Sequence, residues 1–77
     1  MMIKNIENIT FQFCASPESL SLEFLDENKD AFMDIEYKDN KYKINFYKSE
    51  DHFSISLEKF IEGIQTIKKR VNSLNTI

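Results

Sequence analysis

The segment MDIEYKDNKYKINF, residues 33–46, predicts a β-hairpin on which the rest of the fold can be assembled. Apolar and polar residues alternate on both sides of Asp39-Asn40, a dipeptide that tolerates the positive φ angles of a two-residue turn. A turn at this point places Ile35 opposite Ile44, with other apolar residues paired on the same face. A slip of one residue would turn every apolar side chain to the other face, so the pattern itself supports this register.

The same alternation continues on the N-terminal side of the hairpin. Residues 9–15 and 20–24 alternate apolar and polar side chains, and turn-forming residues lie between the two segments. Together with the hairpin they predict an antiparallel meander. Residues 1–8 are compatible with a helical turn, a loop or an earlier start of the first strand, and these alternatives stay open.

A fifth strand is expected after the loop at residues 48–51. A loop of this length would pair Phe46 with Phe53 on the same apolar face as the hairpin. The alternative is a sheet of four strands, in which the segment around Phe53 becomes part of the turn before the helix. We therefore expect four to five strands over about residues 9–55.

The C-terminal segment predicts one amphipathic helix at about residues 57–74. Its apolar residues recur at spacings of three and four within an arc of roughly 140°; they are Leu57, Phe60, Ile61, Ile64, Ile67, Val71 and Leu74. Ser56 is a good N-cap. Gly63 costs roughly 1 kcal/mol relative to alanine inside a helix, so it indicates a close approach between helix and sheet. The chain is therefore expected to be a single α+β domain, residues 1–77, with the helix packed on one face of the sheet.

Length and composition narrow the protein class. The chain has 77 residues, enough for one domain, and its only cysteine, Cys14, cannot form an intrachain disulfide. Stability must then come from a core rich in its seven Phe and three Tyr or from self-association, which makes a homodimer a reasonable expectation. The net charge of −3 argues against a dedicated binder of duplex DNA. The sequence lacks a signal peptide and a membrane-length apolar run, so a cytoplasmic location is expected.

No combination of residues predicts catalysis, a metal site or a cofactor. His52 is the only histidine, and its charged neighbours Glu50 and Asp51 fall in an expected turn, so no base in a pocket can be assigned. Cys14 and His52 are expected on strands that a meander keeps apart, which argues against a nucleophile pair. One His and one Cys are too few for structural zinc, and the acidic loop at residues 26–30 lacks the glycine and distal glutamate of a calcium loop.

The sheet face that the helix leaves open is the predicted partner-binding surface. The expected register aligns three aromatic side chains across it: Phe32, Tyr47 and His52. Acidic side chains on the same face are Glu23, Asp34 and Glu36. A contiguous exposed aromatic patch suggests a partner. The alternative is that the N-terminal segment folds over this face and buries it.

Basic residues near the hairpin turn support an alternative function. They are Lys38, Lys41, Lys43 and Lys48, close to Tyr47. Lysines combined with stacking rings on a curved sheet are typical of single-stranded nucleic-acid binding. In outline, a meander followed by a helix resembles the β4α single-stranded-DNA-binding coactivators, and the strand-to-helix junction FSISLE at residues 53–58 is similar to theirs. The resemblance covers the topology and this junction, while the arginines and the lysine–glycine turn of that family are absent here.

Two hypotheses follow for the function. The first is a non-enzymatic protein-binding module, such as a bacterial or phage inhibitor, immunity or anti-defence protein that covers a surface of its partner. Small size, acidity, absent catalytic motifs and the aromatic row support it, and heavy use of Lys, Asn and Ile is typical of AT-rich bacterial and phage genomes. An acidic protein of this kind can also mimic nucleic acid towards a basic partner. The alternative is a single-stranded nucleic-acid-binding β-sheet protein that acts as a dimer.

Overall fold

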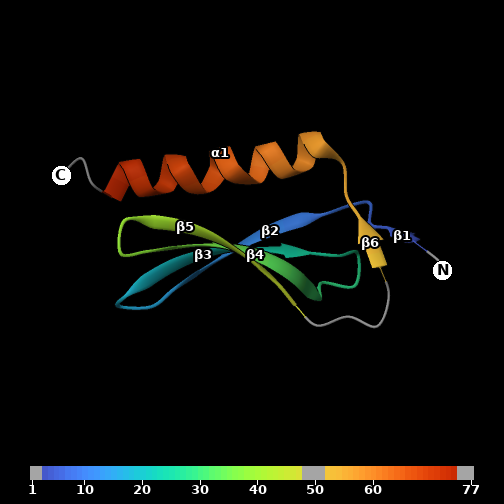
Figure 1. The fold of residues 1–77 in the computed structure, drawn as a ribbon, viewed down its shortest axis with the longest axis horizontal. Helices are drawn as coiled ribbons and strands as arrows, with labels where there is room; N and C mark the ends of the chain where they lie inside the picture. The colour runs from blue at the N-terminus through green and yellow to red at the C-terminus, as the bar shows by residue number, and fades with distance from the viewer. Residues whose placement is uncertain (1–2, 48–51, 75–77) are drawn as a thin grey trace.

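The computed structural model describes residues 3–47 and 52–74, and it places one helix over a four-stranded sheet (Figure 1). The antiparallel sheet has the order β2-β3-β4-β5, and its strands are β2 (Thr10–Ala15), β3 (Ser19–Leu25), β4 (Ala31–Lys38) and β5 (Lys41–Phe46). The helix α1 spans Leu57–Leu74. These elements confirm the predicted α+β fold, an antiparallel meander with a C-terminal helix packed on it. No helix in the described part of the chain has the length and apolar character needed to cross a membrane.

The β4–β5 hairpin has the predicted turn and register. Asp39 and Asn40 take φ angles of 53° and 64°, the left-handed conformations that a two-residue turn of this type requires. Ile35 pairs with Ile44, and the other apolar residues of the two strands also face each other. The alternation of the sequence and the chemistry of the turn therefore agree on one arrangement.

The predicted fifth strand of the meander is wrong. Residues 52–54 form β6 (His52–Ser54), which pairs in parallel with β1 (Ile3–Asn5) instead of with β5. This small sheet lies at one end of the molecule, beyond the start of α1 (Figure 1). Phe46 and Phe53, which were expected to pair, still contact each other, with ring centroids 6.5 Å apart. The loop expected at residues 48–51 lies outside the described residues.

The N-terminal segment closes one end of the core. After β1 the chain passes through Asn8, which has a φ of 55°, into β2. Ile6 and Ile9 are buried on this path, with 9% and 6% of their surface exposed. The described residues 3–9 therefore contribute to the core and do not fold over the outer face of the sheet.

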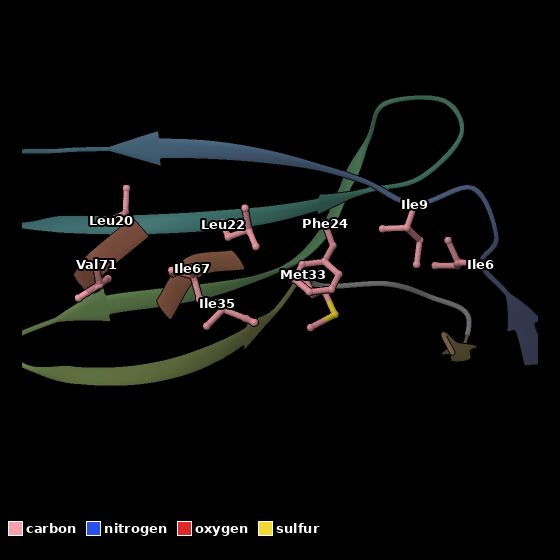
Figure 2. Close-up of a cluster of buried hydrophobic side chains, with 9 residues drawn as sticks. All are labelled: Ile6, Ile9, Leu20, Leu22, Phe24, Met33, Ile35, Ile67 and Val71. Atoms are coloured by element: carbon pink, nitrogen blue, oxygen red, sulfur yellow. The ribbon is translucent and has the colours of Figure 1, made fainter. Parts of the chain in front are cut away.

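The main core lies between α1 and the middle of the sheet (Figure 2). Its fully buried side chains are Leu22, Phe24, Met33 and Ile67. The helix lies close against the sheet at Gly63, because a Cβ atom placed there would lie only 2.3 Å from Cζ of Phe24. The predicted close approach at this glycine is confirmed.

A bulge turns Phe32 towards the core. The β3–β4 register shifts between Phe24 and Leu25, so β4 carries one extra residue at this point. The ring of Phe32 packs edge-on against Phe53, with centroids 5.3 Å apart, and it also contacts the buried Phe24. The prediction that Phe32 lies on the outer face is therefore wrong.

Candidate functional site

Large apolar side chains stay exposed on the edge strand β5 and on α1. Five of them define the surface that we call the β5–α1 groove: Tyr42 (41% exposed), Ile44 (41%), Phe46 (68%), Leu57 (67%) and Ile61 (43%). The three β5 residues lie opposite core residues of β4, so they point to the helix side of the sheet. Lys68, on the same side of α1 as Leu57 and Ile61, holds its ammonium 5.7 Å from the ring centroid of Tyr42.

One end of the groove deepens into an apolar pocket of about 340 Å³. Its lining comprises Met33, Phe46, Phe53, Ile55, Ser56, Leu57 and Phe60. Among the described residues of this lining Ser56 is the only polar one, so this part of the pocket suits an apolar or aromatic side chain rather than a charged group.

The free backbone groups of β5 belong to the same residues that line the groove. In a two-residue hairpin the pair next to the turn exchanges hydrogen bonds, and hydrogen-bonded and non-bonded pairs alternate from there. The N–H of Tyr47 donates to the carbonyl of Phe32 at 3.2 Å, which fits this alternation. Tyr42, Ile44 and Phe46 therefore direct their N–H and C=O groups away from β4, towards the open edge.

The other edge of the sheet is better protected. On β2, the ammonium of Lys59 lies 5.2 Å from the ring centroid of Phe11, and the guanidinium of Arg70 lies 4.4 Å from that of Phe13. Both rings are half-buried under these helix side chains. Phe46 on β5 stays 68% exposed. Of the two edge strands in the described sheet, β5 thus has the less protected side chains.

The groove was not predicted from the sequence, for two reasons. The five-strand alternative placed a further strand on the free edge of β5, and the helix was expected to cover the apolar face. A helix is about 10–12 Å wide with its side chains, whereas four strands about 4.8 Å apart form a wider sheet. This width mismatch was the available signal that the apolar residues of an outer strand would stay uncovered.

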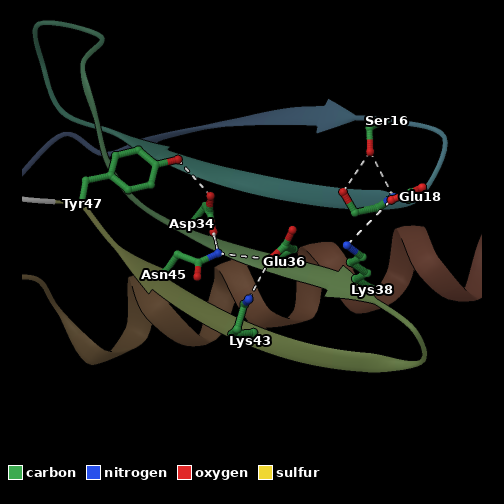
Figure 3. Close-up of polar contacts among 9 residues, drawn as sticks. Ser16, Glu18, Asp34, Glu36, Lys38, Lys43, Asn45 and Tyr47 are labelled. Atoms are coloured by element: carbon green, nitrogen blue, oxygen red, sulfur yellow. Dashed lines mark hydrogen bonds and ion pairs between the residues drawn. The ribbon is translucent and has the colours of Figure 1, made fainter.

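The outer face of the sheet carries a network of polar side chains (Figure 3). Asp34 is only 9% exposed, and its carboxylate accepts hydrogen bonds from Nδ2 of Asn45 at 2.8 Å and from the hydroxyl of Tyr47 at 2.9 Å. Asn45 also donates to Glu36 at 3.3 Å, and Glu36 pairs with the ammonium of Lys43 at 3.4 Å. Three predicted site residues, Asp34, Glu36 and Tyr47, do come together, with their polar atoms bonded within the chain.

Glu23 extends this network towards β2. It lies directly opposite Asp34, and the hydroxyl of Tyr47 is close to both carboxylates, 3.3 Å from Glu23. Glu23 also accepts hydrogen bonds from Gln12 at 3.4 Å and from the thiol of Cys14 at 3.3 Å. The outer face is therefore acidic and internally bonded.

The predicted aromatic row across the outer face is not formed. Phe32 is turned inward by the bulge, and His52 lies in β6 opposite Ile3. Only Tyr47 keeps its predicted place beside the outer carboxylates. The row depended on a β5–β6 pairing, and it disappears because β6 pairs with the N-terminal strand.

The lysines predicted for nucleic-acid binding lie around the hairpin turn. Lys38, Lys41 and Lys43 line a shallow hollow of about 230 Å³, together with Glu36 and Asp39. Lys38 lies 3.8 Å from a carboxylate oxygen of Glu18. Lys48 lies outside the described residues. The positive charges that are described are therefore interleaved with carboxylates.

Hydrogen bonding and burial shift three pKa values in the outer network. Burial and the hydrogen bond to Asp34 raise the pKa of the Tyr47 phenol far above its usual range. The hydrogen bond to Glu23, with some burial, raises the pKa of the Cys14 thiol. The amide of Asn45 lowers the pKa of Glu36. A thiol with a raised pKa is a weaker nucleophile at neutral pH, so the site lacks an activated cysteine.

We expect the Tyr47 phenol to make stability depend on alkaline pH. The folded state keeps the proton above the pKa of about 10 at which an unfolded tyrosine loses it, so stability is present below that pH and falls as pH rises beyond it. In the Tyr47→Phe variant, stability should fall less steeply with pH in this range. Urea unfolding midpoints at about pH 7 and about pH 10.5 measure this loss of stability. Tyr37→Phe, which removes a hydroxyl that donates to Asn40, is the matched control; equal slopes in all three proteins would contradict the expectation.

In the part of the chain that the structure describes, no three His, Cys, Asp or Glu side chains lie close enough together to hold a metal ion. In the acidic loop, Oδ1 of Asp26 instead accepts hydrogen bonds from the N–H groups of Asn28 and Asp30. This carboxylate stabilises its own turn.

Comparisons with known proteins identify no relative. The sequence matches no protein-family model, and neither the curated proteins nor the solved structures give a significant match. The β5–α1 groove and the outer network are therefore the features from which a function can be inferred.

Proposed function

We propose that this chain is a non-enzymatic, cytoplasmic protein-binding module that docks its partner along the β5–α1 groove. One observation carries the proposal: the exposed apolar side chains of Tyr42, Ile44 and Phe46 belong to the residues whose backbone groups face the open edge. A strand edge with exposed apolar residues invites association, and proteins usually protect such an edge unless it has a partner.

The geometry supports binding by strand addition. An extended segment of a partner can bond to the backbone of β5 as a further strand, and its alternate side chains then enter the groove. The pocket beside Phe46 and Leu57 accepts one of these side chains as an anchor. Covering a partner's strand in this way suits an inhibitor, immunity or anti-defence protein, the role that the sequence favours.

We place the anchor in the groove and not on the outer network. The polar atoms of Asp34, Glu36 and Tyr47 already bond to neighbours in the chain, so a partner would have to replace those bonds. Single-stranded nucleic-acid binding remains the second hypothesis. It is less favoured because Lys38 and Lys43 each lie beside a carboxylate.

Selection from a displayed library of extended peptides tests the proposal. We expect peptides with alternating apolar residues, and we expect Phe46→Glu to weaken their binding about tenfold or more, because a charge replaces an anchor contact. Asn28→Glu, which places the same charge in the exposed loop between β3 and β4, is the matched control and should leave binding unchanged. Peptides that ignore Phe46→Glu, or a selection on the monomeric chain at low concentration that yields none, would contradict docking in the groove.

A second arm tests the nucleic-acid hypothesis with a mixed single-stranded oligonucleotide. Binding at low salt that falls steeply with added salt and is lost in Lys41→Glu would favour that hypothesis. We expect no such binding, because the lysines around the turn are interleaved with carboxylates.

A further inference from the structure

We propose that the occupant of the β5–α1 groove is a second copy of this chain, joined through antiparallel pairing of β5 with β5 about a twofold axis at Ile44. The inference rests on the proposed docking function of the groove and names its partner. Four features carry it: the backbone groups of β5, the match of side chains across the axis, the exposed area and the protection of the opposite edge.

The backbone of β5 pairs best with itself when the axis passes Ile44. In that register Ile44 faces its own copy, and Tyr42 faces Phe46 of the second copy. These are the three residues whose N–H and C=O groups point outward, so each pair can exchange hydrogen bonds. An axis at Lys43 would set two lysines directly opposite each other, which is unfavourable. An axis at Asn45 would leave Tyr42 beyond the end of the partner strand.

Side chains also match in this register. On the helix side, each Tyr42 comes beside Phe46 of the second copy, next to the apolar pocket, and aromatic cross-strand pairs of this kind stabilise sheets. On the outer side, Lys43 faces Asn45 of the second copy. Because Asn45 is bonded to Asp34, the ammonium of Lys43 comes towards a second carboxylate across the axis. No like charges face each other.

The exposed area is close to what a dimer needs. A large side chain has some 150–250 Å² of surface to bury. Multiplied by the exposed fractions of the five groove residues, this gives on the order of 500 Å² of side-chain surface that each copy can bury against a partner. Two copies, with their strand edges, approach the lower limit of about 1,200 Å² for stable interfaces. A dimer of modest affinity follows.

The second edge of the sheet explains why association would stop at two copies. The rings of Phe11 and Phe13 on β2 are covered by Lys59 and Arg70, so this edge offers charged side chains to a further copy. One open edge and one protected edge give a closed, twofold-symmetric dimer and no filament.

Disulfide trapping tests the register. In a Cys14→Ser background, Ile44→Cys should form a disulfide-linked dimer readily, because a residue on the axis has its copy about 5.5 Å away between Cα atoms. Lys43→Cys and Asn45→Cys are matched controls that place the thiols one residue off the axis, and we expect at least about fivefold less dimer from each. Equal yields at the three positions would indicate random collision and overturn the proposal. Circular dichroism of the reduced variants checks that each one is folded.

Light scattering of the unmodified chain gives an independent readout. We expect the mass to rise from 9.2 kDa towards twice that value with concentration, and Phe46→Glu to raise the dissociation constant about tenfold or more. A chain that stays monomeric at about 0.5 mM overturns the dimer, since modest interfaces hold in the micromolar range. If that monomer still binds the selected strand peptides, only the second copy is excluded. If it binds none of them, docking in the groove fails as well.

Discussion

A Gly63→Ala substitution is expected to destabilise the fold by roughly 1–3 kcal/mol, because the added methyl group overpacks the interface between helix and sheet. Alanine favours the helix over glycine by about 1 kcal/mol, so propensity alone predicts the opposite sign. The added Cβ would meet Cζ of Phe24 at 2.3 Å. The Phe24 ring is fully buried and has Phe11, Phe32 and Phe60 as neighbours, so it cannot move aside freely.

Urea unfolding at one fixed protein concentration measures this change, since self-association would otherwise shift the midpoint. Gln65→Ala, at an exposed position two residues along α1, is the matched control and should change stability by only a few tenths of a kcal/mol. A Gly63→Ala variant as stable as the natural sequence would mean that the helix stands further from the sheet than the contact with Phe24 indicates.

Local chemistry was sufficient to predict the meander and the helix. Asp39 and Asn40 form the predicted turn because both residues accept positive φ, and the turn fixes the register of the strands around it. Ser56 caps α1 as predicted, with its Oγ accepting the N–H of Lys59 at 3.1 Å. Each of these features depends on residues a few positions apart, which is why a sequence pattern can reveal it.

The features that the sequence failed to predict depend on distant parts of the chain or on overall dimensions. The pairing of β1 with β6 joins segments from the two ends of the sheet region, and three residues per strand give no periodicity to detect. At the bulge Phe32 is an extra residue that interrupts the regular alternation of β4. Its ring, which was expected on the surface, therefore points inward. The groove follows from the width of a helix compared with that of four strands, a property that alternation alone does not convey.

The candidate site changed for the same reasons. Asp34, Glu36 and Tyr47 were correctly placed on one face, because their strands and register were predicted correctly. His52 was placed there on a pairing that does not occur, and Phe32 on a regular alternation that the bulge interrupts. The exposed residues of β5 were expected to be covered, so the groove emerged only from the structure.

A Phe24→Ala substitution is expected to cost about 3–5 kcal/mol, because it leaves a cavity where the fully buried ring had filled the centre of the core. A chain of this length has a total stability of only about 4–12 kcal/mol, so a substantial fraction of the variant should be unfolded near room temperature. Circular dichroism during urea titration measures the loss. A cost below about 1.5 kcal/mol would contradict the central position of this ring.

Combining the two substitutions shows whether Gly63 and Phe24 act through the same contact. Once the ring is gone, the methyl group of Gly63→Ala no longer collides with it and fills part of the cavity. The double variant should therefore be about 1–2 kcal/mol more stable than the sum of the single effects predicts. Leu22→Ala supplies the control pair, because Leu22 is also fully buried yet is not among the atoms nearest to the Gly63 position. Coupling with Phe24 but additivity with Leu22 would locate the helix–sheet contact at this one ring, whereas additivity in both pairs would show that the glycine serves another purpose.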